Sequence, residues 1–278
     1  MNFVINGINY HVDIRGNGFP LILLHGFTGS SATWAAFENK WSMHSQMISL
    51  DIIGHGESDS PEEISCYEIE HQAEVIYSLM KKMNIGKADI LGYSMGGRLA
   101  ITFAVKYPHM VRSLILESTS PGLKTALERD ERQERDFRLC ELISDKGLKF
   151  FVDYWEDIPL FSSQKRLSEQ KWLAIRNQRL RNNPLGLINS LKGMGTGAQP
   201  SWWDELIKIE FPVLLITGSL DQKFCQLANE MESDFRYAKW KVVEACGHAI
   251  HVENPEIFAT FVSDFLAKIA FSKENGEK

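Results

Sequence analysis

The chain has 278 residues, of which 44% are hydrophobic, and its 36 acidic and 30 basic side chains leave a net charge of −6 at pH 7. This length and composition predict one large soluble domain with an insertion. The negative balance argues against a protein that binds nucleic acid or an anionic membrane surface, because neither ligand would be attracted to it.

The sequence also predicts the cellular compartment of the protein. Its first residues have neither the basic n-region nor the apolar h-region of a secretory signal, and no apolar run approaches transmembrane length. The four cysteines lie far apart and form no CxxC pair, which favours reduced thiols in a cytoplasmic protein; they are Cys66, Cys140, Cys225 and Cys246.

The chain begins with two alternating segments, 2–5 and 8–14, which flank Asn6-Gly7 and predict an antiparallel hairpin. Short apolar runs follow, typical of strands buried between two helical layers; they lie at 21–24, 46–50, 88–91, 111–116, 213–216 and 240–243. Stretches with helical spacing alternate with them, at 67–83, 95–107 and 255–270. This order predicts an α/β fold with a mainly parallel sheet of about eight strands, led by the hairpin.

The segment 121–205 interrupts the alternation, because it has amphipathic helical patterns and no convincing strand. We expect a helical cap, inserted after the sixth strand, over the sheet edge where open α/β sheets bind ligands. The core would then comprise residues 1–120 and 206–271, and the tail 272–278 is expected to be disordered. The glycine-rich stretch 193–203 favours a hinge or ordered loop over a phosphate site.

Residues 92–96, GYSMG, fit the pattern G-x-S-x-G and lie between a predicted strand and a predicted helix. In such a turn, here called the elbow, the serine adopts a strained backbone conformation with its hydroxyl exposed, and the two glycines avoid a collision across the turn. Ser94 is therefore the leading candidate for a functional side chain.

A serine hydroxyl is a poor base or nucleophile at neutral pH, so it needs a histidine and a carboxylate that orients the histidine. Asp221 and His248 each follow a predicted strand, in the order Ser, acid, His that this kind of sheet requires. Glu117 is the competing acid, with a strand-end cap as its other interpretation. His251 is interpreted as structural or adjacent to the substrate.

An oxyanion site needs rigid backbone N–H groups, one of which should belong to Met95, directly after the serine. The second is expected from Phe27, because His25-Gly26-Phe27 follows the strand at 21–24. The stretch 51–58, DIIGHGES, is interpreted as a turn ordered by Asp51 and its glycines.

Together, HGF at 25–27, DIIGHGES at 51–58, GYSMGG at 92–97, Asp221 and His248 resemble the α/β-hydrolase family over residues 3–270. Further details resemble one group within it, the menaquinone-pathway 2-succinyl-6-hydroxy-2,4-cyclohexadiene-1-carboxylate synthases; they are GYSMGGR, PGL at 121–123, an arginine-rich first cap helix, DYW at 153–155, AIR at 174–176 and GSLDQKF at 218–224. The resemblance implies a lyase that uses a Ser-His-Asp triad to remove a proton and expel pyruvate.

This resemblance also implies a small polycarboxylate substrate. Arg98, one helical turn after Ser94, is expected to bind one of its carboxylates through a bidentate pair. The resemblance selects Arg132 and Arg176 as further carboxylate ligands, and we place Tyr93, Trp155 and His25 with the substrate-binding residues. Trp155 is equally well interpreted as a cap-core residue, and Tyr93 either reaches the oxyanion pocket or only packs beneath the cap. The competing interpretation is a solvated helix face, because Glu128 and Arg132, Glu131 and Arg135, and Glu134 and Arg138 have i,i+4 spacing.

Two other functions stay open at this point. The same triad would serve a hydrolase of esters or of C–C bonds in acidic diketones, with Ser94 as nucleophile, although a neutral-ester hydrolase has no evident use for Arg98. A catalytically silent receptor or scaffold on this fold is the third possibility, and the intact triad argues against it. The sequence has no metal-ligand spacing and no dinucleotide fingerprint, and the proposed chemistry needs no cofactor.

Overall fold

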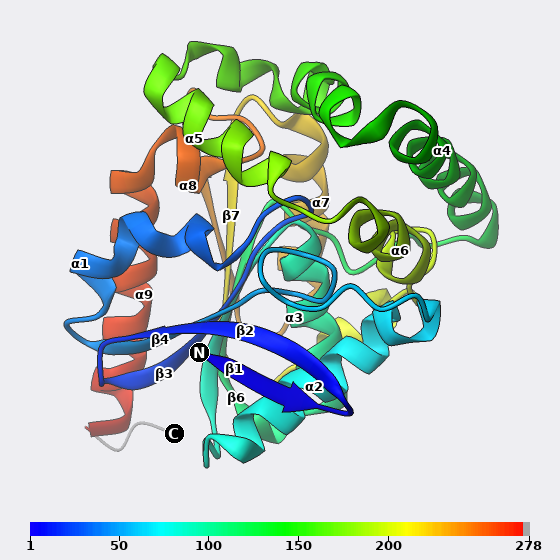
Figure 1. Cartoon of the computed structure of the whole chain (residues 1–278). Helices are drawn as coiled ribbons and strands as arrows, with labels where there is room; N and C mark the ends of the chain where they lie inside the picture. Colours follow the sequence, from blue (N-terminus) through cyan, green and yellow to red (C-terminus); the bar gives the residue numbers. More distant parts are fainter. Residues whose placement is uncertain (275–278) are drawn as a thin grey trace.

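An eight-stranded sheet forms the centre of the molecule in the computed structural model, which describes residues 1–274 (Figure 1). The strands are β1 Asn2–Ile5, β2 Ile8–Arg15, β3 Phe19–Leu24, β4 Ser45–Leu50, β5 Ala88–Tyr93, β6 Val111–Glu117, β7 Val213–Gly218 and β8 Ala238–Val243. Their spatial order is β1-β2-β4-β3-β5-β6-β7-β8. Pairing is parallel from β4 to β8 and antiparallel at β1–β2 and β2–β4, which confirms the predicted fold class.

The hairpin turn lies where the sequence predicts it. Asn6 and Gly7 have φ angles of 52° and 80°, which are the left-handed values that a two-residue hairpin loop requires. The register then pairs Ile5 with Ile8 across the turn.

Helices cover both faces of the sheet. One face carries α2 (Ile69–Lys82), α3 (Met95–Lys106) and α7 (Gln222–Asp234), and the other carries α1 (Glu38–Trp41), α8 (Ile250–Glu253) and α9 (Pro255–Glu274). Short 3-10 helices complete the connections; they are η1 Ser31–Phe37, η2 Ile64–Tyr67, η3 Pro108–Met110, η4 Pro159–Arg166 and η5 Trp203–Lys208.

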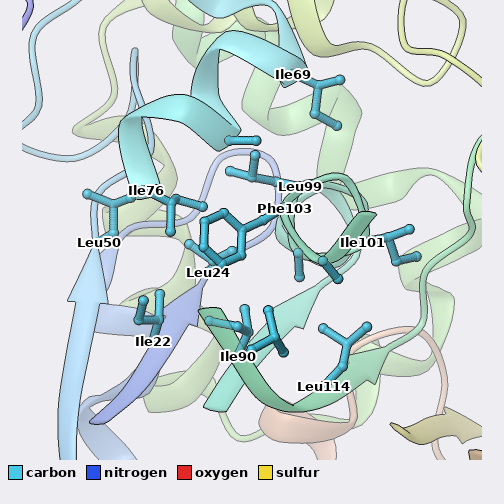
Figure 2. Close-up of a cluster of buried hydrophobic side chains, with 14 of the residues drawn as sticks. Ile22, Leu24, Leu50, Ile69, Ile76, Ile90, Leu99, Ile101, Phe103 and Leu114 are labelled. Atoms are coloured by element: carbon cyan, nitrogen blue, oxygen red, sulfur yellow. The ribbon is translucent and has the colours of Figure 1, made fainter. Parts of the chain in front are cut away.

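The larger core lies between the sheet and the helices α2 and α3. Figure 2 shows strand residues such as Ile22 and Ile90 packing against Ile76 from α2 and Phe103 from α3. Each of these side chains is at most 1% exposed. Full burial of an aliphatic or aromatic side chain contributes about 1.5–3 kcal/mol, so this layer fixes α3 rigidly behind the elbow.

Three longer helices lie between β6 and β7 with no strand among them; they are α4 (Ala126–Asp157), α5 (Glu169–Leu180) and α6 (Pro184–Met194). In Figure 1 they lie above the end of the sheet where the parallel strands stop. They have a small core of their own, which includes Phe151 and Leu187, and Phe27 from the β3 loop packs against it. Gly147 interrupts α4 with a φ of 81° and a ψ of 165°.

Several local expectations need adjustment. The helix α9 continues to Glu274, three residues into the segment 272–278 that we expected to be disordered, and residues 275–278 lie outside the described part. β8 is an edge strand in which Val243 is buried and the other residues are half-buried or exposed, so it lacks the two apolar faces that its sequence suggested. All four cysteines are free thiols. None of the helices within residues 1–274 combines the length and apolar character that a membrane-spanning segment needs.

Candidate active site

The elbow places Ser94 between the end of β5 and the start of α3. Ser94 has a φ of 49° and a ψ of −105°, which is the strained conformation expected from the sequence. A Cβ atom at Gly92 would lie 2.4 Å from the carbonyl oxygen of Gly96, and a Cβ at Gly96 would lie 2.2 Å from the carbonyl oxygen of Leu24. Only glycine fits at both positions, so the two residues allow the turn that presents the serine hydroxyl.

The structure brings Ser94, His248 and Asp221 together. His248 Nε2 lies 3.0 Å from Ser94 Oγ, and His248 Nδ1 lies 2.7 Å from Asp221 Oδ2. An ionised carboxylate only accepts hydrogen bonds, so Nδ1 carries the proton and Nε2 presents its lone pair to the serine hydroxyl. His248 is 1% exposed and Asp221 is 8% exposed, which shields the pair from competing water.

Strand ends position the two partners of Ser94. Asp221 follows β7 and is the N-cap residue of α7, where its Oδ1 accepts a hydrogen bond from the amide of Phe224 at 3.3 Å. This bond fixes the carboxylate, so that Oδ2 faces the histidine. His248 lies in the loop between β8 and α8, and the ring of Phe224 packs against it with centroids 4.6 Å apart.

His25 is held by backbone groups on both sides of its ring. Its Nε2 accepts a hydrogen bond from the amide of Ile52 at 3.0 Å, so Nδ1 is protonated and donates to the carbonyl oxygen of Gly26 at 2.8 Å. Both ring nitrogens are committed to backbone, and burial lowers the pKa of His25 to about 4. A neutral ring held in this way orients the loop that carries Phe27, and its expected contact with the substrate stays a prediction.

The stretch 51–58 is a turn, as the sequence indicates. Asp51 is 1% exposed, and its carboxylate accepts hydrogen bonds from the amides of Ser31 and Glu57. Asp51 therefore ties this turn to the segment that follows β3, next to the expected oxyanion donor Phe27.

Arg98 lies one turn into α3 and is 8% exposed. Its Nη1 donates to the carbonyl oxygen of Met194 at 2.6 Å and to Oε1 of Gln199 at 2.5 Å. Burial lowers the pKa of Arg98, although an arginine still carries its charge at neutral pH. The guanidinium thus binds the segment that returns from α6 to the core, and both of these acceptors are neutral.

The other two expected carboxylate ligands are paired within the cap. Arg132 Nε donates to Asp136 Oδ1 at 2.8 Å, on the next turn of α4. Arg176 binds Glu156 Oε2 at 2.5 Å through Nη1, and it binds Asp153 through Nη2. Of the three i,i+4 pairs that the sequence offers, the structure has the Glu131–Arg135 pair at 3.6 Å. Glu128 instead forms a capping box with Thr125.

Aromatic side chains surround His248 from the cap side and from the sheet side. Trp155 has its ring 5.5 Å from that of Phe27 and 5.8 Å from that of Phe161, and Phe161 lies 6.1 Å from His248. Tyr93 is 9% exposed and lies 5.4 Å from His248, beside Gly26. Tyr93 therefore contacts His248 from the sheet, whereas Trp155 is linked to His248 from the cap through Phe161.

The sequence did not reveal that Glu117 and His251 form a pair. Glu117, which is 0% exposed, accepts hydrogen bonds from the backbone amide and from Nδ1 of His251, each at 2.9 Å. The carboxylate is thus committed to His251, while Asp221 holds His248. The spacing of three residues between the two histidines was the available signal, but it does not reveal which acid each one meets.

Sequence reasoning missed Arg179 altogether. It lies on α5, is 7% exposed, and packs over the ring of Phe161 at 5.1 Å. The local pattern around it is strongly polar, so nothing in the sequence separates this arginine from its exposed neighbours.

Known proteins resemble this chain over nearly its whole length. The alpha/beta hydrolase fold family matches residues 20–255. A protein of Bacillus subtilis (strain 168) named "Putative 2-succinyl-6-hydroxy-2,4-cyclohexadiene-1-carboxylate synthase" is 45% identical over 268 residues, which cover 96% of this chain and 97% of that protein. The 2-succinyl-6-hydroxy-2,4-cyclohexadiene-1-carboxylate synthase of Salmonella agona (strain SL483) is 31% identical over 90% of this chain and 92% of its own. Among solved structures, MenH from S. aureus matches with a TM-score of 0.90 and 33% identity, over 94% of this chain and 98% of that one.

Proposed function

Because the chain belongs to the alpha/beta hydrolase fold family, we propose that it is a lyase acting in menaquinone biosynthesis. It eliminates pyruvate from 2-succinyl-5-enolpyruvyl-6-hydroxy-3-cyclohexene-1-carboxylate and yields 2-succinyl-6-hydroxy-2,4-cyclohexadiene-1-carboxylate. The names of its relatives support this substrate. One observation gives the proposal its main support. Arg98 is buried one helical turn from Ser94, and Ser94 is hydrogen-bonded to His248.

The triad supplies the base. The Ser94 hydroxyl passes its proton to Nε2 of His248, and the serine oxygen accepts the proton from C2 of the substrate ring, next to the succinyl ketone. Asp221 stabilises the imidazolium that forms, because its carboxylate lies 2.7 Å from Nδ1.

Loss of the C2 proton places negative charge on the ketone oxygen. The amide of Met95, at the first position of α3, has no partner within the helix and is our proposed donor to this oxygen, together with the amide of Phe27. The electrons then form the C2–C3 double bond, the existing double bond moves to C4–C5, and the C5–O bond breaks. The departing enolate takes the proton from His248 and becomes pyruvate.

The cap, residues 121–205 in this proposal, covers the reacting centre. Phe161 and Trp155 exclude water above His248, which strengthens the electrostatic interactions below them. The substrate carries carboxylates on the ring, the succinyl group and the enolpyruvyl group, and arginines are the side chains suited to hold them.

The test measures pyruvate release and substrate consumption in the same reaction. Purified protein is mixed with the enolpyruvyl substrate, and pyruvate release is measured together with the loss of the substrate's own absorbance, with Ser94→Ala as the matched control. We expect both signals in the parent and neither in the control. If the parent instead cleaves simple esters and releases no pyruvate, Ser94 acts as a nucleophile and the protein is a hydrolase.

A further inference from the structure

A buried carboxylate joins the cap to the loop that carries His248. The side chain of Glu253, at the end of α8, is 6% exposed. Its Oε1 accepts a hydrogen bond from the hydroxyl of Ser163 in η4 at 2.9 Å, and its Oε2 accepts one from the amide of Gly247 at 2.9 Å. Glu253 therefore binds a cap residue and the residue directly before His248 at the same time.

The cap approaches this loop closely at Gly247. A Cβ atom at Gly247 would lie 2.1 Å from Oγ of Ser163 and 3.0 Å from its Cβ. Rotation of the hydroxyl would relieve only the first of these contacts, so any larger residue would push η4 away from the loop. The glycine before His248 thus allows Ser163 to reach Glu253.

Two other side chains of η4 contact the same loop. The ring of Phe161 packs against that of His248, with centroids 6.1 Å apart. Nη2 of Arg166 donates a hydrogen bond to the carbonyl oxygen of Ala245 at 2.8 Å. Arg166 is exposed, so water competes for its hydrogen bond, whereas the bonds of Glu253 form in a buried place where they are stronger. Glu253 is therefore the firmer polar link between η4 and the loop.

The core holds the loop at different residues. The amide of Ala245 donates to Oγ of Ser219, and the carbonyl oxygen of Cys246 accepts from the amide of Leu220, each at 2.9 Å. These bonds fix residues 245 and 246 to the segment that precedes Asp221. The amide of Gly247 is held by Glu253 instead. The last peptide before His248 thus depends on a carboxylate that also binds the cap.

We propose that Glu253 is a positioning residue for His248, and that the hydroxyl of Ser163 couples the position of His248 to the docking of η4. This inference rests on the proposed function, because it assigns the proton transfer to Ser94 and His248. With η4 docked, the carboxylate is held from both sides and fixes the Gly247 amide. Nε2 of His248 then stays 3.0 Å from Ser94 Oγ, within the range that proton transfer needs. A displacement of about 1 Å at such a contact can cost about a hundredfold in rate.

Ser163→Ala gives the sharpest test, because it removes the hydroxyl from the cap and leaves the bond between Glu253 and Gly247 in place. We expect kcat for pyruvate release to fall about tenfold, which is the size of effect that one charge-assisted hydrogen bond supports. KM should stay within about twofold, because the change acts on the base and not on the bound substrate. Ser162→Ala is the matched control, since Ser162 is the exposed neighbour on η4 and its replacement should change neither constant.

Glu253→Gln should retain most of the activity. Its amide oxygen accepts the hydrogen bond of Gly247 and its amide nitrogen donates to Ser163 Oγ, so both contacts survive without the charge. Glu253→Ala loses both contacts and should lower kcat at least as much as Ser163→Ala does. Adding Ser163→Ala to Glu253→Ala should cause no further loss, because the two residues act through one contact. If Glu253→Ala does not fold, Ser163→Ala alone and in combination with Glu253→Gln decides the question, with the same tenfold loss expected in both.

Labelling of Ser94 by phenylmethanesulfonyl fluoride separates this inference from the proposed reaction. The serine oxygen attacks the sulfur, fluoride leaves, and His248 accepts the hydroxyl proton, so the labelling rate measures the cooperation of Ser94 with His248 without any carboxylate substrate. We expect the labelling rate of Ser163→Ala to fall by about the same factor as kcat. If the parent is labelled but releases no pyruvate, the proposed function fails, and the labelling rates alone test the role of Glu253.

A purely structural role of these contacts gives a different result. Ser163→Ala would then lower the thermal midpoint, while kcat and the labelling rate, measured well below that midpoint, would stay within about twofold of the parent. That result overturns the inference, and so does an equal loss of activity in Ser162→Ala. If the parent shows neither pyruvate release nor labelling, Ser94 and His248 do not act together and the inference fails with the proposed function.

Discussion

The carbonyl oxygen of Glu117 accepts a hydrogen bond from the amide of Ser94 at 2.9 Å. The carboxylate of the same residue binds the amide and ring of His251, three residues after His248. Glu117 therefore connects the elbow to α8, the helix directly after the loop of His248. It binds the elbow through its backbone and α8 through its side chain. We expect this side chain to matter for stability, because its carboxylate is bonded to His251 and not to His248.

Glu117→Gln should lower the thermal midpoint clearly and reduce kcat less than a triad mutation does. The amide keeps the shape of the side chain but loses charge-assisted hydrogen bonds worth about 1.5–3 kcal/mol. In a protein of this size the midpoint moves by roughly 2–4 °C for each kcal/mol. Thermal unfolding and steady-state kinetics measure the two effects, and an unchanged midpoint would show that His251 is held by other contacts.

Asp221→Asn should give the reverse pattern. The fold keeps its N-cap, because asparagine also accepts the Phe224 amide, but the histidine loses the carboxylate that fixes its tautomer and stabilises its charged form. We expect kcat to fall by orders of magnitude with a small change in midpoint. If Asp221→Asn is active and Glu117→Gln is inactive, the acid of the triad is Glu117.

Ser94→Ala and His248→Ala should each abolish most turnover, and the double variant should be little worse than either. The residues form one proton-transfer unit through the 3.0 Å contact between Nε2 and Oγ, so their losses are not additive. Pyruvate release by the three variants measures this. Losses that multiply would indicate two independent contributions.

Arg98→Ala should lower kcat/KM for the polyanionic substrate about a hundredfold, because the loss of a bidentate pair costs about 3 kcal/mol at about 1.4 kcal/mol per tenfold. Arg98→Lys keeps the charge without the planar fork and should recover only part of the loss. Both variants are assayed by pyruvate release over a range of substrate concentrations.

Gln199→Met is the control for Arg98, because it removes a structural contact of the guanidinium and keeps its charge. This variant should lose thermal stability and retain most of the affinity. A loss of kcat/KM as large as that of Arg98→Ala would assign Arg98 to cap docking instead of substrate binding.

The pH dependence of the free energy of unfolding should reflect the protonation of His25. Burial lowers its folded-state pKa to about 4 from the ordinary value of 6.5, so between these pH values the unfolded chain binds a proton that the folded protein does not. Stability from this residue is present above pH 6.5 and is lost as the pH falls from about 6.5 to about 4. At about 1.4 kcal/mol per pH unit the full loss is about 3.5 kcal/mol. Denaturant unfolding should show a shallower decline in His25→Asn, and an equal slope would place the titrating group elsewhere.

Local patterns explain which features the sequence predicts. The hairpin at Asn6-Gly7 and the elbow at Ser94 depend on backbone conformations that a few neighbouring residues dictate, and the structure confirms both. The cap charges are different, because Arg132 has a possible acidic partner on each side along α4. Glu128 is taken by the helix N-terminus, so Arg132 turns to Asp136. The burial of Arg179 depends on how α5 packs against Phe161, which no local pattern encodes.

The position of the cap within the chain has a consequence for how such proteins diversify. β6 and β7 are neighbours in the sheet, yet the chain between them runs through the whole cap. The entropy cost of closing a loop grows only with the logarithm of its length, at about 0.6 kcal/mol per doubling. Replacing a short crossover by an insertion several times longer therefore costs about 1–2 kcal/mol, well below the packing energy of the sheet. Substrate preference can evolve by exchange of the insertion, while the strands that carry Ser94, Asp221 and His248 stay unchanged.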